Sequence, residues 1–274
     1  MIRKGFVFLS ILLTIAWLAI LELSSPTRAA IDLPFGEGET LVFDVYWLNL
    51  YAGRAVMEVK GAVNMRGRDA IHIVGVAESS SKLSLIYTIK DRIETYIDVE
   101  SLLPMKSVVV RKERKADLEK TVIFNRSSLI ATEFITKGQT EKIKRYSIRP
   151  DVQDILSSFY FIRAKGIKPG LPITFPVYAG NKVWDIEISV TGEERLKTPD
   201  GEVDCYIIKP VAKYEGKIQD TGDVIIWITK DSHMVPVKMR SNIKVKIGPA
   251  RIPLGSVTAS LKEYRNGKKF TGKN

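Results

Sequence analysis

Apart from its carboxylates, this 274-residue sequence has few side chains of the types that perform nucleophilic, acid–base or metal chemistry. His72 lies in an alternating apolar run, which predicts a packed or rim histidine. His233 directly follows Asp231 and Ser232, but three adjacent residues cannot act as a catalytic triad, because the base must be oriented beside the nucleophile in space. The single cysteine, Cys205, lies in a predicted strand and is expected to be a buried, small apolar residue; the alternative is a reactive or intermolecular thiol.

Carboxylates are therefore the remaining candidates for catalysis. Two histidines and one cysteine at scattered positions make no zinc-binding pattern, and the sequence contains no phosphate loop or nucleophile motif. We expect no metal and no cofactor. Paired carboxylates from distant positions can still meet in space, as in a glycosidase, so a hydrolase of an envelope polymer is one hypothesis. The sequence does not rank its candidates, which are Glu37, Glu39, Asp44, Asp91, Asp154 and Asp223.

The elements that must position these side chains are mostly strands. Alternation of polar and apolar residues, with turn signals between the runs, predicts about fourteen strands. Short loops between such strands favour a mainly β, antiparallel protein, with a strongly bent sheet or an incomplete β-barrel. The predicted strands are 41–48, 57–63, 70–78, 92–98, 105–112, 118–125, 129–136, 143–148, 172–178, 183–191, 203–211, 222–230, 235–247 and 252–264.

One segment has helical spacing instead. Apolar residues recur every three or four positions, which predicts an amphipathic helix near 151–164. Asp151 is placed to cap its amino end, Gly166 fits the carboxyl-end cap, and Pro169 prevents continuation. The helix either packs on the sheet as core or covers an apolar cavity. Its apolar stripe consists of Val152, Ile155, Leu156, Phe159, Tyr160 and Ile162.

A break in composition follows this helix, from Arg163 to Pro172, and reads as a linker. The chain is expected to form one β-rich domain over 30–274; the alternative is that this linker separates two halves, 31–150 and 165–274. No internal repeat supports duplicated halves.

The first thirty residues predict where the protein acts. A basic start at Arg3 and Lys4 precedes an apolar run over 5–21 and a small-residue exit, the pattern of a secretory signal peptide. We expect cleavage near Ala29, which gives a 1–29 signal and a periplasmic or secreted protein. The minor alternative is an inner-membrane anchor formed by residues 5–21.

The formal net charge of +11 favours anionic partners. Export makes lipid head groups or envelope glycans better candidates than nucleic acid, which we do not expect as a partner. The densest basic cluster is either a solvated hairpin tip or an anion-binding patch. It consists of Arg111, Lys112, Arg114 and Lys115.

Three stretches together carry a family resemblance: the segment 34–47, the helix segment 154–163 and the strand segment 226–231. With them the chain resembles domain-of-unknown-function family 3108, bacterial exported proteins without an assigned activity, over about 34–264. The last stretch is also weakly similar to the periplasmic lipoprotein-carrier (Lol-type) fold. That resemblance implies an incomplete barrel whose apolar cavity shelters acyl chains.

The leading hypothesis is a non-enzymatic periplasmic protein that binds a lipid, a lipoprotein or another envelope amphiphile in an apolar cavity. The alternative is an envelope structural or adaptor protein that binds protein or peptidoglycan through its surface or a sheet edge. Its oligomeric state is left open. The residues expected near the cavity are Trp47, Tyr51, Leu156, Phe159, Tyr160, Phe161, Trp184 and Trp227.

Overall fold

A computed structural model describes residues 32–84, 88–112, 117–218, 224–247 and 250–270, and for 243–247 and 250–254 it describes the backbone alone. The predicted signal segment lies outside the described residues, as do Arg114, Lys115 and Asp223. The described residues belong to one unit, Asp32–Phe270. None of the helices within it is long and apolar enough to cross a membrane.

Strands dominate, as the alternating pattern predicts. Eight precede the main helix: β1 (Thr40–Trp47), β2 (Leu50–Met65), β3 (Arg68–Ser79), β4 (Lys90–Asp98), β5 (Pro104–Arg111), β6 (Leu118–Asn125), β7 (Ile130–Lys137) and β8 (Thr140–Ser147). The strands after it are β9 (Ile173–Ala179), β10 (Lys182–Thr198), β11 (Gly201–Tyr214), β12 (Lys217–Ile218), β13 (Ile225–Thr229), β14 (Pro236–Ile247) and β15 (Ala250–Arg265). A short helix, α2 (Ser81–Ser84), was not predicted from the sequence.

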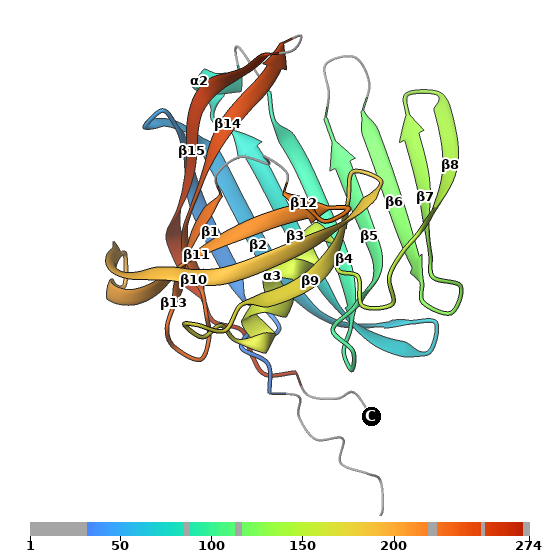
Figure 1. Ribbon diagram of the computed structural model, residues 1–274, viewed down its shortest axis with the longest axis horizontal. Helices are drawn as coiled ribbons and strands as arrows, with labels where there is room; N and C mark the ends of the chain where they lie inside the picture. Colours follow the sequence, from blue (N-terminus) through green and yellow to red (C-terminus); the bar gives the residue numbers. More distant parts are fainter. Residues whose placement is uncertain (1–31, 85–87, 113–116, 219–223, 248–249, 271–274) are drawn as a thin grey trace, which may run out of the picture. The chain divides into compact units, whose positions relative to one another are not determined.

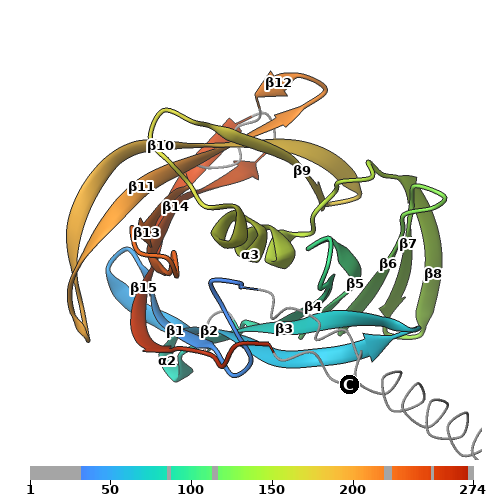
Figure 2. The same ribbon diagram turned by 90° about the horizontal axis from the view of Figure 1, so that it is seen from below.

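The strands form one antiparallel sheet that is not closed into a barrel. Neighbours in sequence pair with each other, and β1 pairs with both β2 and β15, so the first and last strands meet in the middle of the sheet. The two edges are β8 and β9, which the segment containing α3 (Ile155–Lys165) connects. The sheet bends around α3, as Figures 1 and 2 show. This confirms the predicted fold class.

The start of α3 corrects one prediction. The cap is Asp154, not Asp151: its side chain accepts from the Ser157 amide (2.7 Å), and the Ser157 hydroxyl accepts from the Asp154 amide (2.8 Å). This reciprocal pair is a capping box in which the Ser157 hydroxyl takes the place of the more usual Glu or Gln side chain. The preceding residue, Gln153, is extended and pairs with β9 through a bond to Pro176 (2.8 Å). The end of the helix at Gly166 is as predicted.

The core lies on both sides of α3. Leu156 and Tyr160 pack with buried residues of β2, β3 and β4, whereas Ile162 packs with buried residues of β9, β10, β11 and β13. Phe159 is half-buried and contacts both clusters. The helix is therefore core, the first of the two roles left open by its sequence, and it fills the concave side of the sheet.

Candidate functional site

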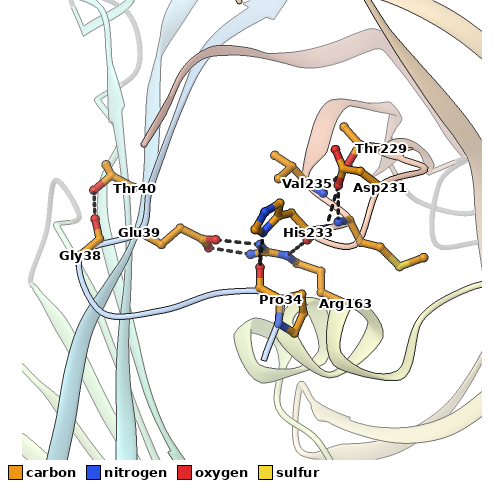
Figure 3. A network of polar contacts seen from close by, with 10 residues as sticks. Pro34, Gly38, Glu39, Thr40, Arg163, Thr229, Asp231, His233 and Val235 are labelled. Atoms are coloured by element: carbon orange, nitrogen blue, oxygen red, sulfur yellow. Dashed lines mark hydrogen bonds and ion pairs between the residues drawn. The ribbon is translucent and has the colours of Figure 1, made fainter. Parts of the chain in front are cut away.

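A fully buried ion pair joins α3 to the segment before β1. Arg163 donates to both oxygens of Glu39, at 2.6 and 2.7 Å, and the two side chains are 2% and 0% exposed (Figure 3). Its remaining donors bond the backbone carbonyls of Pro34 and His233, each at 3.1 Å. Burial by itself lowers the pKa of Arg163. The hydrogen bond to Glu39 and the negative charge of Glu39 outweigh this effect, so the pKa lies above its ordinary value.

Two more buried carboxylates hold elements together. Asp154 accepts from the Thr95 hydroxyl of β4 at 2.5 Å, and burial raises the pKa of Asp154 despite this bond. Glu133 of β7 accepts from Lys120 (3.0 Å) and from Tyr178 of β9 (3.1 Å), which links strands near the two edges of the sheet. Each buried carboxylate therefore has partners that stabilise the fold.

Two of the other carboxylate candidates for a hydrolase lie near arginines. Asp91 lies 3.5 Å from Arg111, and Asp44 lies 3.8 Å from Arg54, although its Oδ1 is buried without a hydrogen-bond partner among the described residues. Glu37 forms a bridge with Lys268 through its backbone and not through its carboxylate. Glu39 and Asp154 are buried carboxylate candidates, and their hydrogen bonds to Arg163 and Thr95 stabilise the fold. The structure therefore gives both residues a structural role.

The histidine and cysteine side chains are packed. His72 stacks on Tyr96 with a centroid distance of 4.4 Å, and its Nε2 lies 2.7 Å from Glu94. Cys205 is buried, as predicted, and burial raises the pKa of its thiol to about 11. In the described part of the chain, no group of three or more His, Cys, Asp or Glu residues could hold a metal ion.

The helix residues predicted near a cavity do come together, within the core. Leu156, Phe159 and Tyr160 pack against the strands as described, and Phe161 contacts Phe175 at a centroid distance of 5.0 Å. Their apolar surface is used to pack α3 against the sheet.

The tryptophans lie elsewhere. Trp227 packs with Cys205 and Val237. Successive side chains of a strand point to opposite faces, so Ile226 and Ile228 face the core around α3 and Trp227 faces away from it. Trp184 lies against Tyr214, with centroids 5.4 Å apart. Trp47 and Tyr51 are exposed at the β1–β2 turn. The expectation that Trp47, Tyr51 and Trp227 share a cavity with the helix is corrected by this placement.

The structure instead shows a mixed basic and apolar cleft of about 420 Å³. Three connections form it: the β2–β3 turn, the β4–β5 loop and the β6–β7 turn. We call it the basic cleft. Its cationic side chains are Arg66, Arg68, Lys106 and Arg126, and its apolar lining includes Met65, Leu103, Met105, Ile123 and Phe124.

The positive charge of the basic cleft exceeds its negative charge. Asp98 is its one acidic lining residue and is paired with Arg68 at 2.8 Å. Lys106 lies 5.4 Å above the Tyr96 ring, a cation–π contact that leaves its charge unneutralised. Arg126 donates to three backbone carbonyls, of which Pro104 is bonded at 2.8 Å. Burial lowers the pKa of Arg126 to about 10, so it stays protonated at neutral pH.

The turns of the basic cleft have strained backbones. Arg66 has φ 56° in the β2–β3 turn, and Leu102 has φ 57° in the β4–β5 loop. Side chains other than Gly, Asn and Asp adopt this region at a cost, and such strain gathers at functional sites. The sequence shows a turn at these positions but gives no signal that three connections so far apart in the chain meet.

The basic cluster predicted between β5 and β6 is described only in part. Arg111 and Lys112 are exposed, and they pair with Asp91 (3.5 Å) and with Asp117. Arg114 and Lys115 lie outside the described residues, so the choice between a hairpin tip and an anion patch stays open.

Comparisons with known proteins give a family and a fold. The family DUF3108, described as a protein of unknown function, matches residues 42–254. A β-barrel-like protein of the family DUF1849 from Brucella abortus is similar in structure, with TM-score 0.52 and 9% identity over 86% of this chain and 100% of that one. No curated protein matches the chain.

Two further solved structures match less closely. A candidate exported protein with a YmcC-like fold from Bacteroides fragilis has TM-score 0.31 and 12% identity over 87% of this chain and 100% of its own. A candidate lipoprotein from Parabacteroides distasonis has TM-score 0.33 and 11% identity over 85% of this chain and 98% of its own.

Proposed function

We propose a binding function, rather than a catalytic one, for this chain, which belongs to the DUF3108 family of proteins of unknown function. It binds an envelope amphiphile with an anionic head group, and it does so in the periplasm after removal of the predicted signal. The observation that carries this proposal is the basic cleft, in which four cations and a single carboxylate lie beside partly buried apolar lining.

The chemistry of the lining selects the ligand class. Guanidinium and ammonium groups bind phosphate and carboxylate through charge-assisted hydrogen bonds. Met65, Leu103 and Met105 contribute apolar surface next to these cations, and methionine adapts to ligands of varied shape. A volume of about 420 Å³ is at the small end of ligand pockets, so the cleft fits a head group and the adjoining part of a chain.

The location of the ligand differs from the leading sequence hypothesis. That hypothesis placed the amphiphile in an apolar cavity beside the helix, but α3 packs against core clusters on both sides. An acyl chain in that space would have to displace Leu156 or Tyr160 from close packing, at a cost of several kcal/mol. The basic cleft needs no such displacement.

Native mass spectrometry with lipid extraction, on protein purified from its own cell envelope, tests the proposal. The decisive variant combines Arg66→Ser with Lys106→Gln, which removes two cations from the cleft. Its matched control combines Lys142→Gln with Arg145→Ser on β8, an equal loss of charge at exposed positions outside the cleft lining. The cleft variant should lose the bound mass while the control keeps it.

Two results count against the proposal. One is a parent protein that is folded and carries no extractable anionic amphiphile. The other is equal retention of the amphiphile by the cleft variant and its control, because binding would then depend on something other than the cleft cations.

The exposed edge of the sheet favours an adaptor as the second candidate function. All but one residue of β8 are exposed, and Ile143 is 60% exposed at this edge. An open edge strand can pair with an extended segment of a partner, although the lysines on β8 also protect it from unwanted pairing. A stoichiometric protein partner in place of a lipid would support this candidate.

A further inference from the structure

The β1–β2 turn carries the densest group of exposed apolar side chains among the described residues. Leu50 is 74% exposed, Leu48 55%, Tyr51 48% and Trp47 37%, all within five consecutive positions. We call these four residues the apolar tip. Exposing apolar side chains to water is unfavourable, so a contiguous exposed group of this kind points to an interaction surface.

The turn places the half-exposed Leu48 side chain over Gly255 of β15, with the backbone in a strained conformation. Leu48 and Asn49 have φ 50° and 64°, the pattern of a tight two-residue hairpin turn that normally takes Asn-Gly. Gly255 of β15 has φ 93°, which favours glycine, and a Cβ there would lie 2.2 Å from Leu48 Cδ2. The Leu48 amide also donates to the Ser256 carbonyl at 3.0 Å. The neighbouring hairpin therefore fixes the position of the tip.

Basic residues flank the apolar tip. α2 follows directly on Ser80, whose amide donates to Ala52 at 2.7 Å, and this contact places exposed Lys82 beside the tip. Antiparallel pairing places the start of β4 and the end of β5 on the same side of the sheet as the start of β2, where these strand ends lie next to one another. The exposed bases Lys90 and Arg111 lie there, in loose contacts of 3.9 and 3.5 Å with Glu78 and Asp91. Such exposed pairs are weak and can exchange for phosphate.

We propose that the apolar tip inserts into the head-group region of a lipid bilayer that contains anionic lipids. Trp and Tyr prefer this region because their rings are apolar and their N–H and O–H groups remain hydrated. Leucines at a tip add apolar burial, and the flanking bases attract anionic head groups, as does the formal net charge of +11 of the whole sequence. This docking is independent of the basic cleft, which the β2–β3 turn forms at the other end of β2.

An environment-sensitive nitrobenzoxadiazole label at Leu50→Cys tests the insertion. The native Cys205 is buried with a raised thiol pKa, so labelling is confined to the new cysteine. The matched control is Val63→Cys, exposed on the same strand but about 40 Å away at the usual rise per residue. Because the label reports its own surroundings, an anchor elsewhere in the full chain does not mimic the result.

The expected result is a blue shift and a several-fold rise in emission at position 50 with vesicles of phosphatidylethanolamine and phosphatidylglycerol, and no change at position 63. Trp47→Gln combined with Leu48→Asn should weaken vesicle affinity, followed by the label at position 50, by about a hundredfold, since each buried apolar side chain contributes about tenfold. An unchanged label at position 50 overturns the proposal. So does an equal response at both positions, an equal response to pure phosphatidylcholine, or a response that needs an added protein partner.

Discussion

Two arginine-containing regions of this protein differ in how their charge is balanced. In the interior, Arg163 meets Glu39 in a two-fold hydrogen-bonded pair, and its other donors bond carbonyls. In the basic cleft, the hydrogen bonds of Arg126 go to backbone carbonyls, and Lys106 faces a ring. Burial lowers the pKa of Arg126, and Asp151 and Asp154 lie near enough to offset part of that shift. A buried charge that is fully matched maintains the architecture, whereas a charge surplus beside apolar surface is available to a ligand. The two regions should therefore respond oppositely to mutation.

The largest effect is expected from breaking the interior pair. Glu39→Gln or Arg163→Met leaves one charge buried without its partner, which costs about 3–5 kcal/mol in the free energy of unfolding. Urea denaturation followed by circular dichroism measures this loss. Binding in the basic cleft should persist wherever the variant is folded, because neither residue lines it.

The double variant Glu39→Gln with Arg163→Met is the control for this contrast. It removes both charges together, so it should be more stable than either single variant, with a coupling energy of about 1–3 kcal/mol. Additive losses in the double variant would mean that the two residues act separately.

A smaller effect is expected at Asp154. Asp154→Ala removes the cap of α3 and the acceptor of the Thr95 hydroxyl, at a cost of about 1–3 kcal/mol. Asp154→Asn keeps a capping side chain and should lose less. If the Asp154→Ala and Asp154→Asn variants lose the same stability, the contribution of the Asp154 carboxyl does not come from capping the helix.

The same residue predicts a pH dependence. Burial raises the pKa of Asp154, so the folded state holds the proton more tightly than the unfolded chain. Its contribution to stability is therefore greatest below the ordinary aspartate pKa and is lost as pH rises through the raised value. Asp154→Asn should remove this slope from the pH profile of unfolding; an unchanged profile would assign the slope to other groups.

The fold was largely predictable from local patterns. Alternation gives the strands, and the spacing from Ile155 to Ile162 gives α3, because both periods follow from backbone geometry. The cap was misplaced because Asp151 and Asp154 are both suitable residues, and the choice depends on Thr95 and on the pairing of Gln153 with β9. Those contacts join positions far apart in the chain.

The sites were much less predictable. The basic cleft combines residues from three connections separated by dozens of positions, and its bases look like ordinary surface lysines and arginines in the sequence. Trp47 and Tyr51 were recognised as notable, but the sequence did not indicate that they lie at an exposed turn instead of in the core. Charge balance and exposure are properties of the assembled sheet.

Arg66→Gly should have the opposite effect to the interior variants: it should keep stability and lose binding. Glycine adopts φ 56° without strain, so stability should stay within about 1 kcal/mol of the parent and rise rather than fall. Loss of this cation should weaken binding of the anionic amphiphile and reduce its dependence on salt. The measurement compares thermal unfolding with lipid retention in one preparation. A variant that is destabilised and binds normally would contradict the assignment of Arg66 to the cleft.

The smallest effect is expected in the interior itself, at one of the four buried polar side-chain atoms that lack a hydrogen-bond partner among the described residues. The Tyr160 hydroxyl is buried and has no hydrogen-bond partner among the described residues, although its ring packs on Phe35 at 4.8 Å. Tyr160→Phe keeps the ring and removes a desolvated hydroxyl, so stability should change by less than about 1 kcal/mol and in the favourable direction. Tyr160→Leu, which loses the ring contacts with Phe35 and Arg163, should be clearly destabilised in the same urea titration. A large loss of stability in Tyr160→Phe would show that the hydroxyl has a hydrogen-bond partner in solution.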